Sequence, residues 1–315
     1  MTRRVAIVGS GYMGGGIAQV MALAGADVRL SDVSYDVTLE NRERLLEETR
    51  RFVADDLFPP DALARIDARI TACESIEAAV EGADFIEEAV PEKLDIKHAT
   101  LARICAAADA QAIIGSNTST ISIAALAEAV TEPSRFLGVH FSNPSPFVPG
   151  VEIIPHAGTS EATVRAACEI VHETGKETAT VSDVTGFVLN RLQYALFHEA
   201  TQLLEEGVAS AEDIDTLVRT TFGFRLPFFG PFAIADMAGL DVYNFCYQSL
   251  QKDFPERFAT PRVLSEMMDQ GRMGTKSGGG FTDVPAERIP ELIAWRNRAY
   301  VKLSKLLEEL GPPPR

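Results

Sequence analysis

Short runs of β-branched and apolar residues alternate with longer amphipathic segments between residue 5 and about residue 182. The amphipathic segments predict helices at residues 14–24, 37–54, 93–107 and 122–130. The short runs predict strands at residues 5–8, 27–31, 84–86, 112–114 and 136–139, with a further β-like run at 151–154. Strands that alternate with helices form a mostly parallel sheet with helices on both faces, which predicts a Rossmann-type α/β fold.

The strand signals disappear beyond about residue 185. A long helical segment at 186–206 is followed by Gly207, a residue type that often ends helices. Further helices are predicted at residues 211–220, 231–250, 260–270 and 288–310. Because 315 residues exceed one ordinary hydrophobic core, we expect two domains. The prediction is an α/β domain over residues 1–184 and an all-α domain over residues 185–315.

Composition and charge narrow the class of protein. The chain is 46% hydrophobic with a mean hydropathy of +0.04, and its longest apolar stretches are too short to cross a bilayer. The net charge of −16 argues against binding to nucleic acid or to an anionic membrane surface. The chain enters its first strand without an apolar signal segment, so we expect a cytoplasmic protein. Four widely separated cysteines predict buried, reduced thiols and no metal site: Cys73, Cys105, Cys168 and Cys246.

A glycine-rich turn, Gly9-Ser10-Gly11-Tyr12-Met13-Gly14, lies between the first strand and the first helix. In a dinucleotide site, Gly9 would make the tight turn, Gly11 would let a pyrophosphate approach and Gly14 would let the helix pack on the strand. Asp32 ends the next strand, where it can accept hydrogen bonds from a ribose diol and would repel a 2′-phosphate. No Lys or Arg directly follows Asp32, so the sequence favours NAD over NADP. An ordinary glycine turn is the alternative.

His140 ends the predicted strand 136–140, at the sheet edge where ligands of open α/β folds bind. A proline-rich turn follows and can fold the run 151–154 back beside the first strand, which would bring Glu152 near His140. A carboxylate on one imidazole nitrogen orients the ring and stabilises the imidazolium formed when the other nitrogen accepts a proton. We therefore predict that His140 is a general base supported by Glu152.

Two neutral polar residues complete the predicted catalytic set. Ser119 follows the strand at 112–114, and Asn190 shares a helix face with apolar residues, where an unpaired amide would be costly. Both can hydrogen-bond a reacting oxygen, although a turn serine and a helix-packing asparagine are the alternatives. The other histidines are weaker candidates: His98, His156, His172 and His198.

These motifs are similar to those of the L-3-hydroxyacyl-CoA dehydrogenase family along essentially the whole chain. The resemblance implies that His140 and Glu152 abstract a proton and that Ser119 and Asn190 contact the substrate. It also implies a homodimer formed through the helical domain. We place Tyr12 and Met13 of the turn, Asn117 beside Ser119, and the family positions Glu92, Lys97 and Asn143 at the cofactor. The matching stretches are 9–14, 89–92, 116–119, 140–144, 151–152, 186–191 and 230–232.

The chain departs from CoA-using members of the family in two places. Its second N-terminal helical segment ends in Asp55 and Asp56, where CoA users carry basic residues, and Val148-Pro149-Gly150 replaces a common lysine. The segment 222–231 resembles the branch of L-gulonate 3-dehydrogenase, lambda-crystallin and carnitine dehydrogenase. Arg225 within it is a candidate for binding a substrate carboxylate, with a surface arginine as the alternative.

The expected activity is NAD-dependent oxidation of the 3-hydroxyl of a small 3-hydroxy carboxylic acid to the 3-keto acid. The first alternative is a 3-hydroxyacyl-CoA dehydrogenase, for example one acting on 3-hydroxybutyryl-CoA. The second is a non-catalytic, crystallin-like NAD-binding protein, which would have no need of the His140, Glu152 and Asn190 set.

Overall fold

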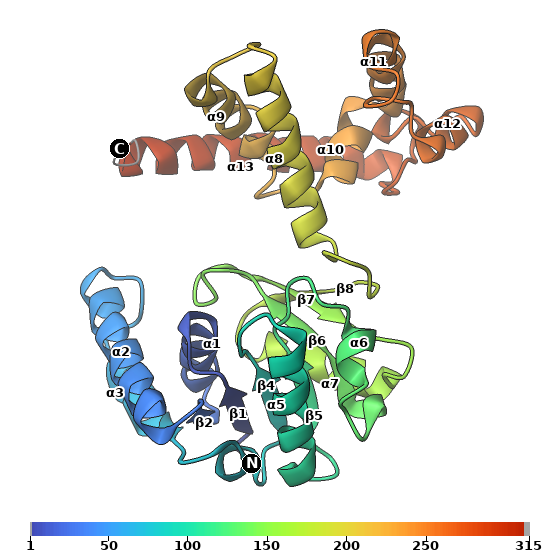
Figure 1. Ribbon diagram of the computed structural model, residues 1–315. Helices are drawn as coiled ribbons and strands as arrows, with labels where there is room; N and C mark the ends of the chain where they lie inside the picture. The colour runs from blue at the N-terminus through green and yellow to red at the C-terminus, as the bar shows by residue number, and fades with distance from the viewer. Residues whose placement is uncertain (1, 312–315) are drawn as a thin grey trace. The chain divides into compact units, whose positions relative to one another are not determined.

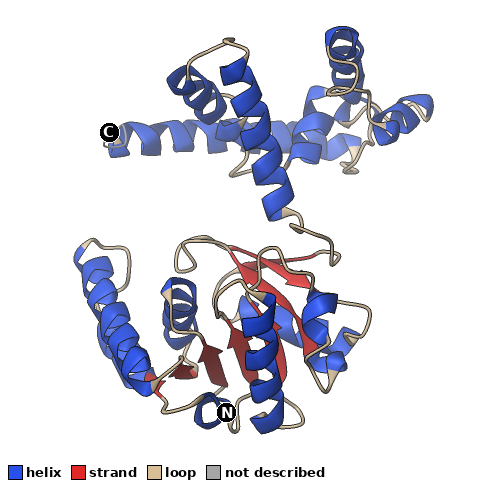
Figure 2. Ribbon diagram, in the orientation of Figure 1, coloured by secondary structure: helices blue, strands red, loops and turns tan. Residues whose placement is uncertain are grey.

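The computed structural model describes residues 2–311 and contains two compact units, Met1–Phe197 and His198–Arg315. The first unit is α/β and the second is helical (Figures 1 and 2). The division lies inside helix α8 (Leu189–Glu205), which continues from one unit into the other. The domain boundary predicted at 184/185 therefore stays a prediction.

The α/β unit is built on one eight-stranded sheet of order β3-β2-β1-β4-β5-β6-β7-β8. All neighbours pair in parallel except β6 and β7, which are antiparallel. The strands are β1 (Arg4–Val8), β2 (Asp27–Ser31), β3 (Ile70–Ala72), β4 (Phe85–Glu88), β5 (Ile113–Ser116), β6 (Phe136–Phe141), β7 (Gly150–Ile154) and β8 (Glu177–Thr180). The predicted mostly parallel sheet is confirmed. β3 and β8 were not predicted, because they are short and carry polar residues at the two edges of the sheet.

Strand β1 shows how the sheet buries both faces. Val5 and Ile7 point into one core with α1 (Tyr12–Leu23), α2 (Tyr35–Ala54), α3 (Ala62–Arg69) and α7 (Glu161–His172). Ala6 and Val8 point into the opposite core with α4 (Ile76–Val80), α5 (Leu94–Ala107) and α6 (Ile123–Ala127). Four successive apolar residues, 5–8, are what a sheet covered on both faces requires. The helices cover the two faces but not the carboxyl ends of the parallel strands, and the polar loops lie at that edge.

The helical unit contains the second half of α8 and α9 (Ala211–Thr220), α10 (Pro231–Ala238), α11 (Leu240–Asp253), α12 (Arg262–Asp269) and α13 (Ile289–Leu310). The single helix predicted at 231–250 is wrong. Gly239 interrupts it with φ of 102°, a left-handed backbone angle that separates α10 from α11. The long helix predicted from residue 186 begins at Leu189, because Gly186 and Phe187 also have positive φ.

Two further features bear on the predictions from composition. The four cysteines are free, as expected, but three are only partly buried and Cys246 is exposed, so the prediction of buried thiols is wrong. Within residues 2–311, no helix combines the length and the apolar character needed to cross a bilayer.

Candidate active site

Strands β6 and β7 bring His140 and Glu152 together. The two residues are direct partners in the antiparallel register, and the imidazole Nδ1 lies 2.8 Å from the carboxylate Oε2. The predicted return of the second strand beside the first is therefore present. Both residues are buried, with 5% and 8% of their surface exposed, so water does not compete for this contact. Such an imidazole can accept a proton at Nε2 while Glu152 stabilises the charge.

The second carboxylate oxygen of Glu152 is held by backbone groups. Its Oε1 accepts hydrogen bonds from the N–H groups of Val188 and Leu189, each at 2.9 Å, at the start of α8. Burial by itself would raise the pKa of Glu152. The hydrogen bonds from His140, Leu189 and Val188 outweigh that effect and hold its pKa below the usual value. Backbone donors leave no mark in the sequence, which is why these contacts were not predicted.

Ser119 lies on the other side of the imidazole. Its Oγ is 3.2 Å from His140 Nε2, the nitrogen that does not face Glu152. The loop that carries Ser119 is organised by Glu92, whose Oε1 accepts hydrogen bonds from the backbone N–H groups of Ser119 and Thr120 at 2.9 and 2.8 Å. Burial would raise the pKa of Glu92, but its hydrogen bonds, led by that from Thr118, and the charge of Lys97 lower it. Glu92 thus positions the serine loop, a contact that the sequence did not indicate.

Asn190, on the first turn of α8, joins the same cluster. Its amide Nδ2 donates to the backbone carbonyl of Ser119 at 2.8 Å. The expected partner of this amide is therefore a protein group in the structure. A direct contact of Asn190 with substrate remains a prediction.

Three of the other histidines make hydrogen bonds that belong to the fold. His98 bonds the carbonyl of Ala125, His156 that of Pro133, and His172 the hydroxyl of Thr178. His198 is exposed on α8. Among the histidines, His140 alone pairs with a carboxylate in the described part of the chain.

The glycine-rich turn opens onto a cavity of ≈ 580 Å³. A Cβ on Gly9 would lie 2.6 Å from the backbone of Ala89, and one on Gly14 would lie 1.8 Å from the carbonyl oxygen of Gly9. A Cβ on Gly11 would meet nothing within 4 Å, so the space beside Gly11 is open. These are the steric roles predicted for the three glycines, and the cradle fits a dinucleotide pyrophosphate. Its lining includes Gly9, Gly11, Tyr12, Met13, Asp32, Asn41 and Arg103.

Asp32 lines this cavity and also anchors the turn. Its Oδ2 accepts hydrogen bonds from the backbone N–H and the hydroxyl of Ser10, both at 2.6 Å. The cavity also contains a cation that the sequence did not indicate, because Arg103 reaches it from α5. Arg103 is paired with Glu77, and its hydrogen bonds lower the pKa of Glu77 to about 2. The pairing neutralises a side chain that would otherwise attract a 2′-phosphate.

The remaining residues predicted at the cofactor lie outside the lining of this cavity. Lys97 is fully buried and its Nζ contacts Glu88 at 2.8 Å, within 3.5 Å of Glu92. Asn117 accepts a hydrogen bond from the backbone N–H of Phe141 at 2.8 Å, which ties the ends of β5 and β6 together. Asn143 is exposed in the loop after β6, before a cis bond to Pro144. Their contacts with the cofactor remain predictions.

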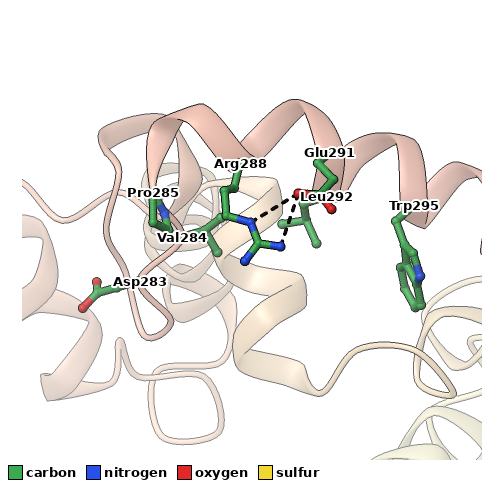
Figure 3. A pocket seen from close by; sticks show the side chains of 7 residues that line it. All are labelled: Asp283, Val284, Pro285, Arg288, Glu291, Leu292 and Trp295. Atoms are coloured by element: carbon green, nitrogen blue, oxygen red, sulfur yellow. Dashed lines mark hydrogen bonds and ion pairs between the residues drawn. The ribbon is translucent and has the colours of Figure 1, made fainter.

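Arg225 lies in the helical unit, in the short helix η2 (Gly223–Arg225). It is exposed and forms no ion pair within residues 2–311. Another arginine of this unit, Arg288, lines a cavity of ≈ 330 Å³ beside Trp295. Figure 3 shows its guanidinium directed at Glu291, with which it forms a surface ion pair at 3.2 Å. Arg225, unlike Arg288, keeps its charge available for an anion.

Comparison with known proteins identifies the family. The model of the NAD-binding domain of 3-hydroxyacyl-CoA dehydrogenase matches residues 4–184, and the model of the C-terminal domain of that enzyme matches residues 186–284. The chain is 35% identical to a 3-hydroxybutyryl-CoA dehydrogenase of Bradyrhizobium diazoefficiens, over 89% of this chain and 95% of that protein. It is also 35% identical to 5-formyl-3-hydroxy-2-methylpyridine 4-carboxylate 5-dehydrogenase of Mesorhizobium japonicum, over 98% of this chain and 99% of that protein.

Solved structures agree with this assignment. A 3-hydroxyacyl-CoA dehydrogenase from Archaeoglobus fulgidus is 32% identical with a TM-score of 0.79, covering 97% of this chain and 99% of its own. A crystal structure of the 5-formyl-3-hydroxy-2-methylpyridine 4-carboxylic acid 5-dehydrogenase, described as an NAD⁺-dependent dismutase, is 34% identical with a TM-score of 0.73, covering 98% and 99%. With its glycine turn, its paired histidine and glutamate and these relatives, the chain belongs to the 3-hydroxyacyl-CoA dehydrogenase family and is an NAD-dependent oxidoreductase.

Proposed function

We propose that this enzyme oxidises the 3-hydroxyl of a small 3-hydroxy carboxylic acid to the 3-keto acid, with NAD as the oxidant and His140 as the general base. The observation that carries the proposal is the position of His140, with Nδ1 on the Glu152 carboxylate and Nε2 beside Ser119 Oγ. A secondary alcohol that displaces the serine contact would present its proton to Nε2.

In the proposed reaction, His140 Nε2 accepts the hydroxyl proton while the hydrogen on C3 leaves as hydride. NAD supplies the hydride acceptor, and the residues that would hold it are the glycine turn and Asp32. Glu152 stabilises the imidazolium, and Ser119 Oγ donates a hydrogen bond to the developing carbonyl oxygen. Asn190, by holding the carbonyl of Ser119, keeps the serine loop against the base.

Three observations favour a free acid over a CoA thioester. A relative whose printed name contains a free pyridine 4-carboxylate and no CoA matches 98% of this chain. Asp55 and Asp56 are exposed where a CoA phosphate would need cations. Arg225 carries an unpaired charge suited to a substrate carboxylate. The same observations support placing the chain in the branch of L-gulonate 3-dehydrogenase and carnitine dehydrogenase.

A 3-hydroxyacyl-CoA substrate is the second candidate, because several relatives carry that activity in their names. NADH formation at fixed NAD, compared across 3-hydroxybutyryl-CoA, free 3-hydroxybutyrate, L-gulonate and carnitine, separates the two. A higher kcat/KM for one of the free hydroxy acids supports the proposal, and a higher value for the thioester overturns the free-acid assignment. Absence of turnover with every compound would favour the non-catalytic alternative.

We also propose that the enzyme is a homodimer formed through the helical domain predicted from the sequence, residues 185–315, which includes α8. None of the 17 residues of α8 is buried, and its exposed apolar side chains include Leu192, Tyr194 and Phe197, the last at 63% exposure. An exposed apolar helix face of this kind is typical of a surface that packs against another protein chain. Sedimentation equilibrium should give twice the chain mass, and Phe197→Glu should shift it toward the monomer. The cytoplasmic location stays a prediction.

A further inference from the structure

The segment that leads into α8, residues 183–190, contacts three separate parts of the α/β unit. Asp183 accepts hydrogen bonds from the backbone N–H groups of Ile123 and Ala124 at 2.9 and 2.7 Å, at the start of α6. The N–H groups of Val188 and Leu189 bind Glu152 on β7. The Asn190 amide binds the carbonyl of Ser119. One short segment therefore touches both the carboxylate and the serine that flank His140.

We propose that residues 183–190 form a positioning strap for the catalytic base, in which two backbone N–H groups hold and orient the Glu152 carboxylate against His140. This inference rests on the proposed function, because it assigns a role to the strap in the same reaction. The N–H groups of Val188 and Leu189 reach His140 only through Glu152, so these two residues are positioning residues.

The backbone conformation at residues 186 and 187 positions the N–H groups of Val188 and Leu189. Gly186 and Phe187 have φ of 77° and 48°, in the left-handed region that residues with a side chain rarely adopt. The Phe187 ring is only 1% exposed, shares a buried core with residues of α5 and α6, and lies 5.9 Å from the imidazole of His140. Burial of this ring holds the unusual turn in place, and the turn aims the N–H groups of the next two residues at a single oxygen.

The donors also belong to the positive end of a helix. Leu189 is the first residue of the 17-residue helix α8, whose first N–H groups have no partner within the helix. Glu152 is buried, so without these donors its negative charge would be costly. Within residues 2–311, His140 is the titratable group that lowers the pKa of Glu152. The other groups that lower this pKa are the backbone N–H donors of the strap. The strap therefore favours the ionised form of the Glu152 carboxylate.

The test removes one donor and leaves every charge in place. Leu189→Pro deletes the N–H at the first helical position, where proline is tolerated. We expect the acidic limb of the pH profile of kcat/KM to move up by about one pH unit, the effect of one hydrogen bond to a charged group. We also expect kcat to fall while the NADH dissociation constant stays the same. Leu189→Ala keeps the N–H and should keep the acidic limb of the wild type, whatever its effect on rate.

A second pair of variants tests the left-handed turn and remains informative if the proline variant does not fold. Phe187→Gly permits positive φ, whereas Phe187→Val disfavours it. Both variants remove the buried ring, so the difference between them isolates the backbone effect, and we expect the valine variant to shift the acidic limb further upward than the glycine variant does. An unshifted limb in both Leu189→Pro and Phe187→Val, with NADH binding intact, would overturn the proposal. An equal shift in Leu189→Ala and Leu189→Pro would do so as well.

A measurement that does not depend on enzyme turnover tests the strap independently of the proposed function. A ¹³C-carboxyl NMR titration of glutamate-labelled enzyme, with the Glu152 signal assigned from Glu152→Gln, should show a higher pKa for Glu152 in Leu189→Pro than in the wild type. If no 3-hydroxy substrate is turned over, the proposed function fails, and this titration still tests whether the strap holds the carboxylate. An unchanged Glu152 titration in a folded Leu189→Pro variant would reject the strap.

Discussion

His140 and Glu152 are twelve residues apart in the chain and directly opposite each other on paired strands, with Nδ1 and Oε2 2.8 Å apart. The antiparallel register fixes their backbones, so the carboxylate orients the ring with little conformational freedom to lose. The pair lies at the carboxyl end of β6, beside loops from β4 and β5 that carry Glu92 and Ser119. A buried, oriented imidazole follows from this one strand pairing.

Replacing the proposed base should abolish most of the activity and spare the cofactor site. His140→Ala is expected to lower kcat at least roughly a hundredfold, the low end for a lost general base. The dissociation constant of NADH, measured by fluorescence quenching, should change little because the glycine-turn cavity does not include His140. His172→Ala, which removes a surface histidine bonded to Thr178, is the control. A comparable loss of NADH binding in His140→Ala would show that the residue supports the fold instead.

Glu152 should matter for stability as well as for rate. Its pKa is below the usual value in the folded state, so its ionised form stabilises the fold above the ordinary carboxyl pKa, and this stabilisation is lost as pH falls through the lowered value. Glu152→Gln should therefore lower kcat and also reduce the loss of unfolding free energy on acidification. Urea unfolding at a series of pH values below 6 measures the second effect. An unaltered acid dependence would contradict the lowered pKa of Glu152.

Glu87 should have the opposite effect on how the free energy of unfolding depends on pH. Its side chain is fully buried in the sheet, both carboxylate oxygens lack partners, and burial raises its pKa well above the usual value. The folded protein holds a proton that the unfolded chain releases, so stability falls as pH rises from the ordinary carboxyl pKa toward the raised one. Glu87→Gln should flatten this decline above the ordinary carboxyl pKa, as measured by urea unfolding at a series of pH values.

The neighbouring glutamate is the matched control for Glu87. Glu88 is equally buried but accepts hydrogen bonds from Lys97 Nζ at 2.8 Å and Ser116 Oγ at 2.6 Å. Glu88→Gln removes the nearer and fully buried of the two carboxylates beside the Lys97 ammonium, leaving Glu92 at 3.5 Å, and is expected to destabilise the protein by about 3–5 kcal/mol at neutral pH. Similar stability changes in the two variants would refute the distinction between a paired and an unpaired carboxyl.

The glycine turn offers a comparison between steric packing and ligand approach. Gly14→Ala places a methyl group 1.8 Å from the carbonyl oxygen of Gly9, so we expect lower thermal stability together with lost NADH binding. Gly11→Ala meets nothing within 4 Å and should leave the melting temperature near that of the wild type. Its methyl group occupies the space proposed for the pyrophosphate, so NADH affinity should fall about tenfold or more, roughly 1.4 kcal/mol. Unchanged NADH affinity in Gly11→Ala would show that the pyrophosphate does not bind beside Gly11.

Arg225 tests the nature of the substrate. Arg225→Ala should raise KM for substrates with a free carboxylate and leave KM for the corresponding CoA thioester unchanged, because only the former offers a partner for the guanidinium. Arg288→Ala, at an arginine of the same unit already paired with Glu291, serves as the control. Equal KM values for the wild type and Arg225→Ala on every carboxylate would show that Arg225 does not bind the substrate.

The sequence by itself determined the sheet-and-helix pattern of the first unit, the helical second unit, the glycine turn and the pairing of His140 with Glu152. These features depend on local periodicity, on turn residues and on a short hairpin, all of which are encoded by neighbours in the chain. Edge strands β3 and β8 and the break at Gly239 depend on neighbours distant in sequence, and the pattern did not predict them.

The tertiary structure alone decided how the site is supported. Glu92 on the serine loop, Arg103 in the cavity and the N–H groups of Val188 and Leu189 on Glu152 all come from segments remote in the chain. A backbone N–H is present at nearly every residue, so its role depends on where folding places it and not on which side chain it carries. For that reason the His140–Glu152 pair could be predicted from the residues, whereas the groups that hold its carboxylate could be identified only from the fold.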